Sequence, residues 1–232
     1  MNGNRTKPDL TLVNLIHQSL RADAQRLAGA VTALDPSDRA DRLPGIRAFF
    51  DHYHAQLATH HTHEDELFFP ALQAKVGADR MHLNALAGQH EALDAALHAA
   101  CDGLAALADP AGNFAADRAR AAGALSDMAE LLAAHLTLEE ETALPLTESE
   151  ISAAEYKKLE TKARKATPRP QAQFMIPWII AHADADQQKA LYRSAPPIRI
   201  LYWLNRRRYH HLDQALTHAA RQPAAAPLSR PT

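Results

Sequence analysis

Apolar side chains recur at helical spacing along four long segments of this chain. In the first segment, Leu12, Ile16 and Leu20 fall four residues apart, which is typical of one apolar face of an α-helix. The four segments span residues 10–34, 44–77, 80–107 and 115–143, and Pro, Gly and Asp punctuate the short stretches between them. Long helices with short connections pack antiparallel, so the sequence predicts an all-α, up-and-down four-helix bundle.

The composition supports a helical fold and excludes some partners. Hydrophobic residues make up 47% of the 232 residues, enough for a sizeable core, and 25 Lys and Arg balance 27 Asp and Glu. We therefore expect no nucleic-acid partner, which would require a clustered positive field. An uninterrupted apolar run of about 20 residues is absent, so we expect no membrane partner. The single cysteine, Cys101, and the absence of a signal peptide indicate the cytoplasm.

The sequence changes character beyond residue 146. Thr147 and Glu150 have the spacing of a capping box, which would begin a fifth helix that ends near Ala166. Further helices are expected at about residues 185–193 and 198–220. We therefore divide the chain into a bundle with the candidate site (1–146), a helical extension (147–222) and a disordered tail (223–232).

The extension contains apolar side chains that water would not tolerate. Trp178, Ile200, Trp203 and Leu204 are among them. The sequence predicts that this region packs on the bundle or forms a homodimer surface. The adjacent arginines at 206–208 are expected to form a solvated helix face, and the alternative is a site for phosphate or an acidic partner.

Histidine is unusually frequent, and its distribution indicates metal binding. There are 14 histidines, and five fall between His52 and His63. Such a tract is typical of metal sites, although a solvated, histidine-decorated helix is the alternative.

Two segments repeat the same arrangement of imidazole and carboxylate. His60 is followed four residues later by Glu64, and His135 by Glu139; a proline follows each glutamate after six residues. Positions i and i+4 share one helix face, so each helix offers one imidazole and one carboxylate to the same point. A carboxylate can bridge two cations, and two facing copies of the motif would supply two of them. A surface His/Glu pair is the alternative for one copy but a poor explanation for two.

Two more histidines would complete the set. His17 lies among Val13, Ile16 and Leu20, and His90 lies among apolar residues of the third segment. A single core histidine is usually structural, but here each of four helices carries one on its apolar side. Bundle cores are where such side chains converge on metals. The predicted set is His17, His60, Glu64, His90, His135 and Glu139.

The donor types favour iron. Mixed imidazole and carboxylate ligation suits iron, with zinc and manganese as rivals, and the set contains no thiolate of the kind that structural zinc sites use. The Glu-x-x-His motif of ferritin-like bundles does not occur in the sequence.

This pattern resembles the hemerythrin or HHE cation-binding domain over roughly residues 10–146. The resemblance rests on the doubled His-x-x-x-Glu, the prolines that follow, and the single histidines on the first and third helices. It implies two non-haem iron ions joined by an oxo or hydroxo bridge, with Glu64 and Glu139 as bridging ligands.

One ligand of the oxygen-carrying relatives has no obvious counterpart. They carry two histidines four residues apart on the third helix, whereas the neighbours of His90 at that spacing are Leu86 and Asp94. His61 is the best replacement, because some relatives supply a ligand directly after the preceding histidine. Tyr53 and Asp94 are alternatives. Tyr53 could instead donate a proton or hydrogen bond to a bound oxygen species as a catalytic group.

The resemblance implies that an open iron position binds or processes a small ligand such as dioxygen, peroxide or nitric oxide. Two alternatives stay open. One is an enzyme that disproportionates peroxide or reduces nitrogen oxides at the same centre. The other is a helical interaction protein with zinc or no metal in the site.

Overall fold

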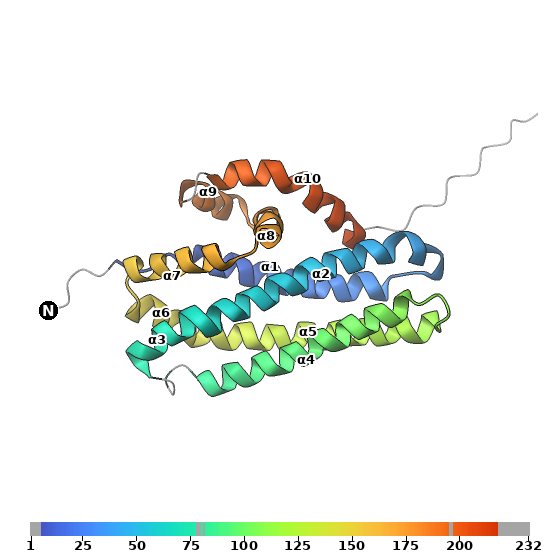
Figure 1. The fold of residues 1–232 in the computed structure, drawn as a ribbon, viewed down its shortest axis with the longest axis horizontal. Helices are drawn as coiled ribbons and strands as arrows, with labels where there is room; N and C mark the ends of the chain where they lie inside the picture. Colours follow the sequence, from blue (N-terminus) through green and yellow to red (C-terminus); the bar gives the residue numbers. More distant parts are fainter. Residues whose placement is uncertain (1–5, 78–79, 81, 195–196, 218–232) are drawn as a thin grey trace, which may run out of the picture.

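Four long helices form the bundle, as Figure 1 shows. The computed structural model describes residues 6–77, 80, 82–194 and 197–217. Within the bundle, α1 packs against α2 and α5, and α4 packs against the same two helices. The helices are α1 (Thr11–Thr32), α2 (Arg39–His63), α4 (Leu83–Ala108) and α5 (Phe114–Glu141). The described residues contain no strand, so the predicted all-α, up-and-down bundle with additional C-terminal helices is confirmed.

The remaining elements lie at the ends of the bundle or follow it in the chain. A 3-10 turn, η1 (Pro36–Asp38), leads into α2, and a π-helical turn, η2 (Glu64–Phe68), follows it. The shorter helices are α3 (Phe69–Val76), α6 (Ala143–Glu150), α7 (Ala153–Ala166), α8 (Arg169–His182), α9 (Ala185–Ser194) and α10 (Pro197–Thr217). The predicted helix end at Ala220 and the predicted disordered tail lie outside the described residues.

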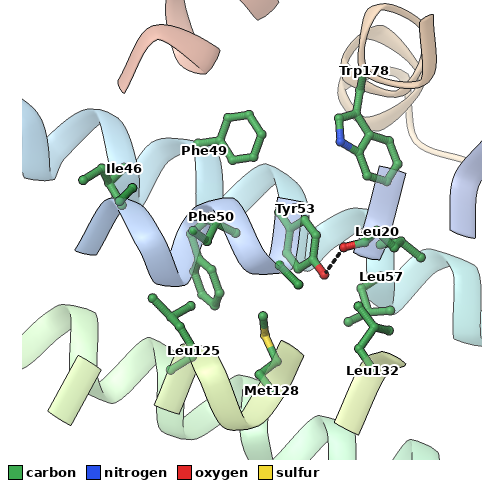
Figure 2. Close-up of a cluster of buried hydrophobic side chains, with 14 of the residues drawn as sticks. Leu20, Ile46, Phe49, Phe50, Tyr53, Leu57, Leu125, Met128, Leu132 and Trp178 are labelled. Atoms are coloured by element: carbon green, nitrogen blue, oxygen red, sulfur yellow. Dashed lines mark hydrogen bonds between the residues drawn. The ribbon is translucent and has the colours of Figure 1, made fainter. Parts of the chain in front are cut away.

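Interlocking apolar side chains hold the bundle together. Figure 2 shows Phe50 and Leu57 of α2 facing Leu125, Met128 and Leu132 of α5. All five side chains are at most 1% exposed. At this degree of burial each side chain contributes about 1.5–3 kcal/mol relative to an exposed position. The helical periodicity of the sequence therefore corresponds to a continuous core.

Two predicted boundaries were wrong. Helix α2 begins at Arg39 rather than near Pro44, because η1 leads directly into it. Pro44 lies inside the helix, where its fixed φ is helical but its missing N–H leaves the Ala40 carbonyl without the usual backbone hydrogen bond. The capping box is formed by Ser152 and Glu155 rather than Thr147 and Glu150. The Ser152 hydroxyl accepts the Glu155 N–H at 3.3 Å, and the Glu155 carboxylate accepts the Ser152 N–H at 3.0 Å. Thr147 and Glu150 lie inside α6.

The C-terminal helices lie on the α1–α2 side of the bundle (Figure 1). Helix α8 contacts α1 and α2, and α10 contacts α8, α2 and α1. No helix in the described ranges is long and apolar enough to cross a membrane.

A buried carboxylate joins α8 to α1. Asp23 is 0% exposed and accepts hydrogen bonds from the Trp178 indole at 2.7 Å and from His182 at 3.1 Å. Arg26 donates to Asp23 at 2.6 Å and also reaches Asp213 of α10 at 2.6 Å. One acidic side chain of the bundle therefore organises the attachment of two C-terminal helices.

Replacing Asp23 with alanine should lower the free energy of unfolding by about 2–4 kcal/mol, because the Trp178 indole and the Arg26 guanidinium lose a buried partner. Urea denaturation measures the change. Asp127→Ala, at an exposed position on α5, serves as the matched control and should stay within about 0.5 kcal/mol of the parent. Equal losses in the two variants would contradict this role for Asp23.

Candidate metal centre

The bundle brings all seven predicted ligand residues together at one end. They come from four helices and the π-helical turn: His17 from α1, His60 and His61 from α2, Glu64 from η2, His90 from α4, and His135 and Glu139 from α5. Every one of these side chains is buried, with an exposed fraction of at most 9%.

The seven residues divide into two groups that could each hold a metal ion. One group contains His61, Glu64, His90 and His135, and the other contains His17, His60, Glu64 and Glu139. In each group the candidate ligand atoms all lie within 4.8 Å of one another. Glu64 belongs to both groups, whereas Glu139, which the resemblance implies as a second bridge, belongs only to the group of His17 and His60.

The two oxygens of Glu64 face different imidazoles. Oε1 lies 2.8 Å from His60 Nε2, and Oε2 lies 3.6 Å from His90 Nε2. In the second motif helix, Glu139 Oε2 lies 3.3 Å from His17 Nε2. One carboxylate therefore stands between the two groups, which is the arrangement that a shared ligand requires.

A local change of helix type follows the first motif. The Phe69 N–H donates to the Glu64 carbonyl five residues earlier, which makes residues 64–68 a π-helical turn. Pro70 has no N–H and cannot bond to the carbonyl of Glu66, so the α-helical pattern fails at this point. His60 and Glu64 nevertheless keep the four-residue spacing that places both side chains on the interior face.

The second motif helix is interrupted in a similar position. Helix α5 ends at Glu141, and Thr142 has φ −119° and ψ −67° before α6 begins. Pro145, six residues after Glu139, cannot bond to the carbonyl of Glu141. The prolines of the two motifs thus explain why both helices depart from regular geometry just beyond the site.

The donor atoms of the site lie close to one another but form no hydrogen bonds of good geometry. Among the described residues, the buried side-chain atoms without a hydrogen bond include Nε2 of all five histidines, both carboxylate oxygens of Glu64 and Oε2 of Glu139. Polar atoms left unpaired in a protein interior cost free energy, and native structures contain few of them. Bound cations would satisfy all of these atoms at once, so the side chains present fit a metal centre.

Three of the imidazoles are held from behind through their other ring nitrogen. The Nδ1 contacts are His17 to Glu140 at 2.9 Å, His90 to Asp65 at 3.2 Å, and His135 to Gln89 at 3.3 Å. Metal-binding histidines characteristically donate their second N–H to such an acceptor, which leaves Nε2 free for the metal. Glu140 is itself fixed by two hydrogen bonds from Arg21, at 2.7 and 2.9 Å.

Burial keeps two of the imidazoles unprotonated. Desolvation lowers the pKa of His61 to about 2 and that of His135 to about 3, and the neighbouring histidines add to both shifts. Their Nε2 lone pairs are therefore available, as metal binding requires.

In the group of His17, His60, Glu64 and Glu139, the carboxylates and the imidazoles shift one another's pKa values. Burial opposes protonation of His17, but its contacts with Glu139 and Glu140 prevail and raise its pKa to about 9. Burial also opposes ionisation of Glu64, yet the nearby His60 and His90 hold the pKa of that carboxyl well below its usual range. Burial together with the charge of Glu64 raises the pKa of Glu139. In the absence of metal, protons thus offset part of the negative charge that a cation would neutralise.

The structure separates the three candidates for the additional ligand. His61 belongs to one of the two groups. Tyr53 is 0% exposed, but its hydroxyl donates to the Leu20 carbonyl at 3.1 Å, as Figure 2 shows, so this hydroxyl is engaged with the backbone of α1. Asp94 is exposed and lies in neither group.

Sequence reasoning missed the residues that hold the imidazoles. Asp65 and Glu140 each follow directly after the motif glutamate, and Gln89 precedes His90. The paired acids, Glu64-Asp65 and Glu139-Glu140, were a usable signal, because the same adjacency occurs in both copies of the motif. The signal for Gln89 was too weak, since a single amide beside a histidine is common.

Fold and site together define a helical-bundle domain with a buried His/Glu cluster suited to metal cations. Residues 9–147 match the family model of the hemerythrin HHE cation binding domain. This span is more than half of the chain, which therefore belongs to that family, and the resemblance predicted from the motifs is confirmed. No curated protein and no solved structure shows significant similarity to the chain.

The roles of His61, Tyr53 and Asp94 can be distinguished by metal content. His61→Ala should weaken binding of one metal ion by at least about tenfold, because its group loses one of four donors. Tyr53→Phe and Asp94→Asn should retain the parental stoichiometry. Elemental analysis after anaerobic loading with Fe²⁺ measures each variant, and loss of metal from Tyr53→Phe with retention in His61→Ala would reverse the assignment.

Proposed function

We propose that this chain is a non-haem di-iron protein that binds a small ligand such as dioxygen, peroxide or nitric oxide. The observation that carries the proposal is the position of Glu64, whose carboxylate is shared by two groups of buried, unpaired donors. His17, His60 and Glu139 would hold one ion together with Glu64. His61, His90 and His135 would hold the other, with Glu64 as the common ligand.

The chemistry of the donors supports iron. Each group mixes imidazole nitrogen with carboxylate oxygen, which suits iron and does not resemble a thiolate zinc site. The only cysteine, Cys101, instead contacts His54, at 3.8 Å. Each group supplies four donors, fewer than the six positions of octahedral iron, so a small ligand has room to bind. Iron would supply the redox chemistry and the open position of the centre.

The surroundings favour a small ligand over a bulky substrate. The Phe69 ring stacks on His90 with centroids 6.2 Å apart, and Leu86 and Leu136 are 0% exposed. Such a dry, enclosed environment admits diatomic gases and excludes larger molecules. The Tyr53 hydroxyl is engaged with the Leu20 carbonyl rather than directed at the donors, which favours ligand binding over chemistry that requires a separate proton donor.

The shared and unshared glutamates should differ in their effect on metal binding. Glu64→Gln should weaken both metals, because both groups lose a charged donor, whereas Glu139→Gln should weaken only one. Glu66→Gln, at an exposed position two residues away, is the matched control and should bind two ions. Anaerobic Fe²⁺ titration gives the stoichiometry, and near-ultraviolet absorption after exposure to air identifies a ferric pair. Two retained irons in Glu64→Gln, or a parent protein that takes up zinc but gives no absorption band with iron, would refute the proposal.

Peroxide distinguishes a ligand-binding protein from the enzyme alternative. The iron-loaded parent chain should evolve oxygen from hydrogen peroxide no faster than a sample of Glu64→Gln to which the same amount of iron has been added. An oxygen electrode measures the rate. Sustained and faster oxygen evolution by the parent chain would contradict the binding function and support an enzyme that disproportionates peroxide. Tyr53→Phe in the same assay then tests whether its hydroxyl contributes a proton.

A further inference from the structure

The outer face of α10 exposes four large apolar side chains. Ile200 is 65% exposed, Trp203 64%, Leu204 61% and Leu201 41%. They lie within two turns of one helix, so they form a single patch rather than scattered apolar residues. We refer to these four residues, with Arg199, Arg206 and Arg207, as the α10 outer face.

The helix that carries this face is firmly attached by its other side. Tyr209 is 2% exposed and packs on Phe49 and Phe174, with ring centroids 6.4 and 5.6 Å away. One turn further on, Asp213 accepts a hydrogen bond from Arg26 of α1 at 2.6 Å. The exposed side chains therefore cannot turn inward without breaking these contacts.

Positive charge surrounds the patch. Residues 197–212 of α10 contain Arg199 and the three arginines at 206–208, but no aspartate or glutamate, although the whole chain has a formal charge of −2. The side chains of residues 206–208 are exposed and lie one turn after Trp203 and Leu204. Arg207, three residues after Leu204 and four after Trp203, lies on the side of the apolar patch, whereas Arg208 lines a pocket with His52 and Phe174.

We propose that the α10 outer face binds the surface of an anionic lipid bilayer. Trp203, Ile200 and Leu204 would enter the boundary between headgroups and acyl chains, and the arginines would contact lipid phosphates. Amphipathic helices that lie in the membrane interface combine these residue types, and long basic side chains extend from apolar surroundings to the headgroups. This inference does not depend on the metal centre, because α10 packs on α1, α2, α8 and α9 and supplies no donor to it.

Charge argues against a second copy of the chain as the occupant. Parallel pairing of two α10 helices would place the arginines at 206–208 beside their own copies. Antiparallel pairing would place them beside Arg199. Neither arrangement provides a carboxylate from this stretch, and like charges across an interface are costly. An acidic protein is a weaker match than a bilayer, because the exposed apolar side chains all lie on one helix and an apolar membrane layer accepts them without pockets. Figure 1 shows that helix, α10, at the outside of the molecule.

The proposal departs from the expectation that no membrane is involved. That expectation rested on the absence of an apolar segment long enough to span a bilayer. A helix that lies on the membrane surface needs no such segment, because its backbone hydrogen bonds are internal and only one face is immersed.

Vesicle sedimentation with the full chain tests the proposal. We expect binding to vesicles of phosphatidylcholine with 30% phosphatidylglycerol (about a third anionic lipid) and at least about tenfold weaker binding to phosphatidylcholine alone, with loss in high salt. Trp203 provides a second readout, because the only other tryptophan, Trp178, is 0% exposed. The emission maximum of Trp203 should shift to shorter wavelength only with the anionic vesicles.

Two variants and two matched controls separate the contributions. Trp203→Ser/Leu204→Ser and Arg206→Gln/Arg207→Gln should each reduce the partition coefficient by at least about tenfold. Leu131→Ser, at another exposed leucine, and Arg164→Gln/Lys165→Gln, at exposed cations on α7, should leave it unchanged. Circular dichroism and urea denaturation confirm that each variant is folded.

Three outcomes would overturn the proposal. The first is no binding to anionic vesicles by the parent chain. The second is binding that both control variants reduce as strongly as the α10 variants. The third is a parent chain that does not bind vesicles but forms a dimer in sedimentation velocity, which Trp203→Ser/Leu204→Ser converts to a monomer. That result would assign the face to contact between copies.

Discussion

A buried carboxylate, Glu64, is the constraint on which the candidate centre depends. Its two oxygens are shared between two sets of imidazoles and make no hydrogen bond, in an interior where an uncompensated charge is costly. Only positive charge can stabilise this arrangement, supplied by protons in the metal-free protein or by cations in the loaded one. The bundle is organised around that need, since α1, α2, α4 and α5 each contribute at least one imidazole to the same end.

The rest of the molecule keeps the donors in place. Apolar packing around Phe50, Leu57 and Leu132 fixes the distances between helices, so that residues far apart in the chain meet. Behind the imidazoles, Glu140 and Asp65 accept hydrogen bonds that orient the rings. A site built on packed helices with such supporting contacts is pre-organised, and metal binding then requires little rearrangement.

The C-terminal helices pack on the α1 and α2 side of the family domain. Asp23 joins α8 to α1, and Gln171 of α8 contacts Gln56 and Thr59 of α2, close to the end that carries His60. Helix α10 stands beyond them with its apolar and cationic face exposed. The chain thus combines a buried His/Glu cluster that could hold metal ions with an outward helix face of exposed apolar and cationic side chains.

The sequence by itself determined the helical fold, the family and the seven candidate ligands, because helical periodicity and the His-x-x-x-Glu spacing are local properties of the chain. It did not reveal that Glu64 alone is shared, that Tyr53 bonds to Leu20, or that Asp23 receives Trp178, since each depends on how separate helices pack. The capping box was misplaced because two Ser/Thr-x-x-Glu pairs compete nearby, and only the break after α6 selects Ser152. Exposure of Trp203 was likewise decided by tertiary structure: an amphipathic pattern shows that a helix has two faces, but only packing determines which face is covered.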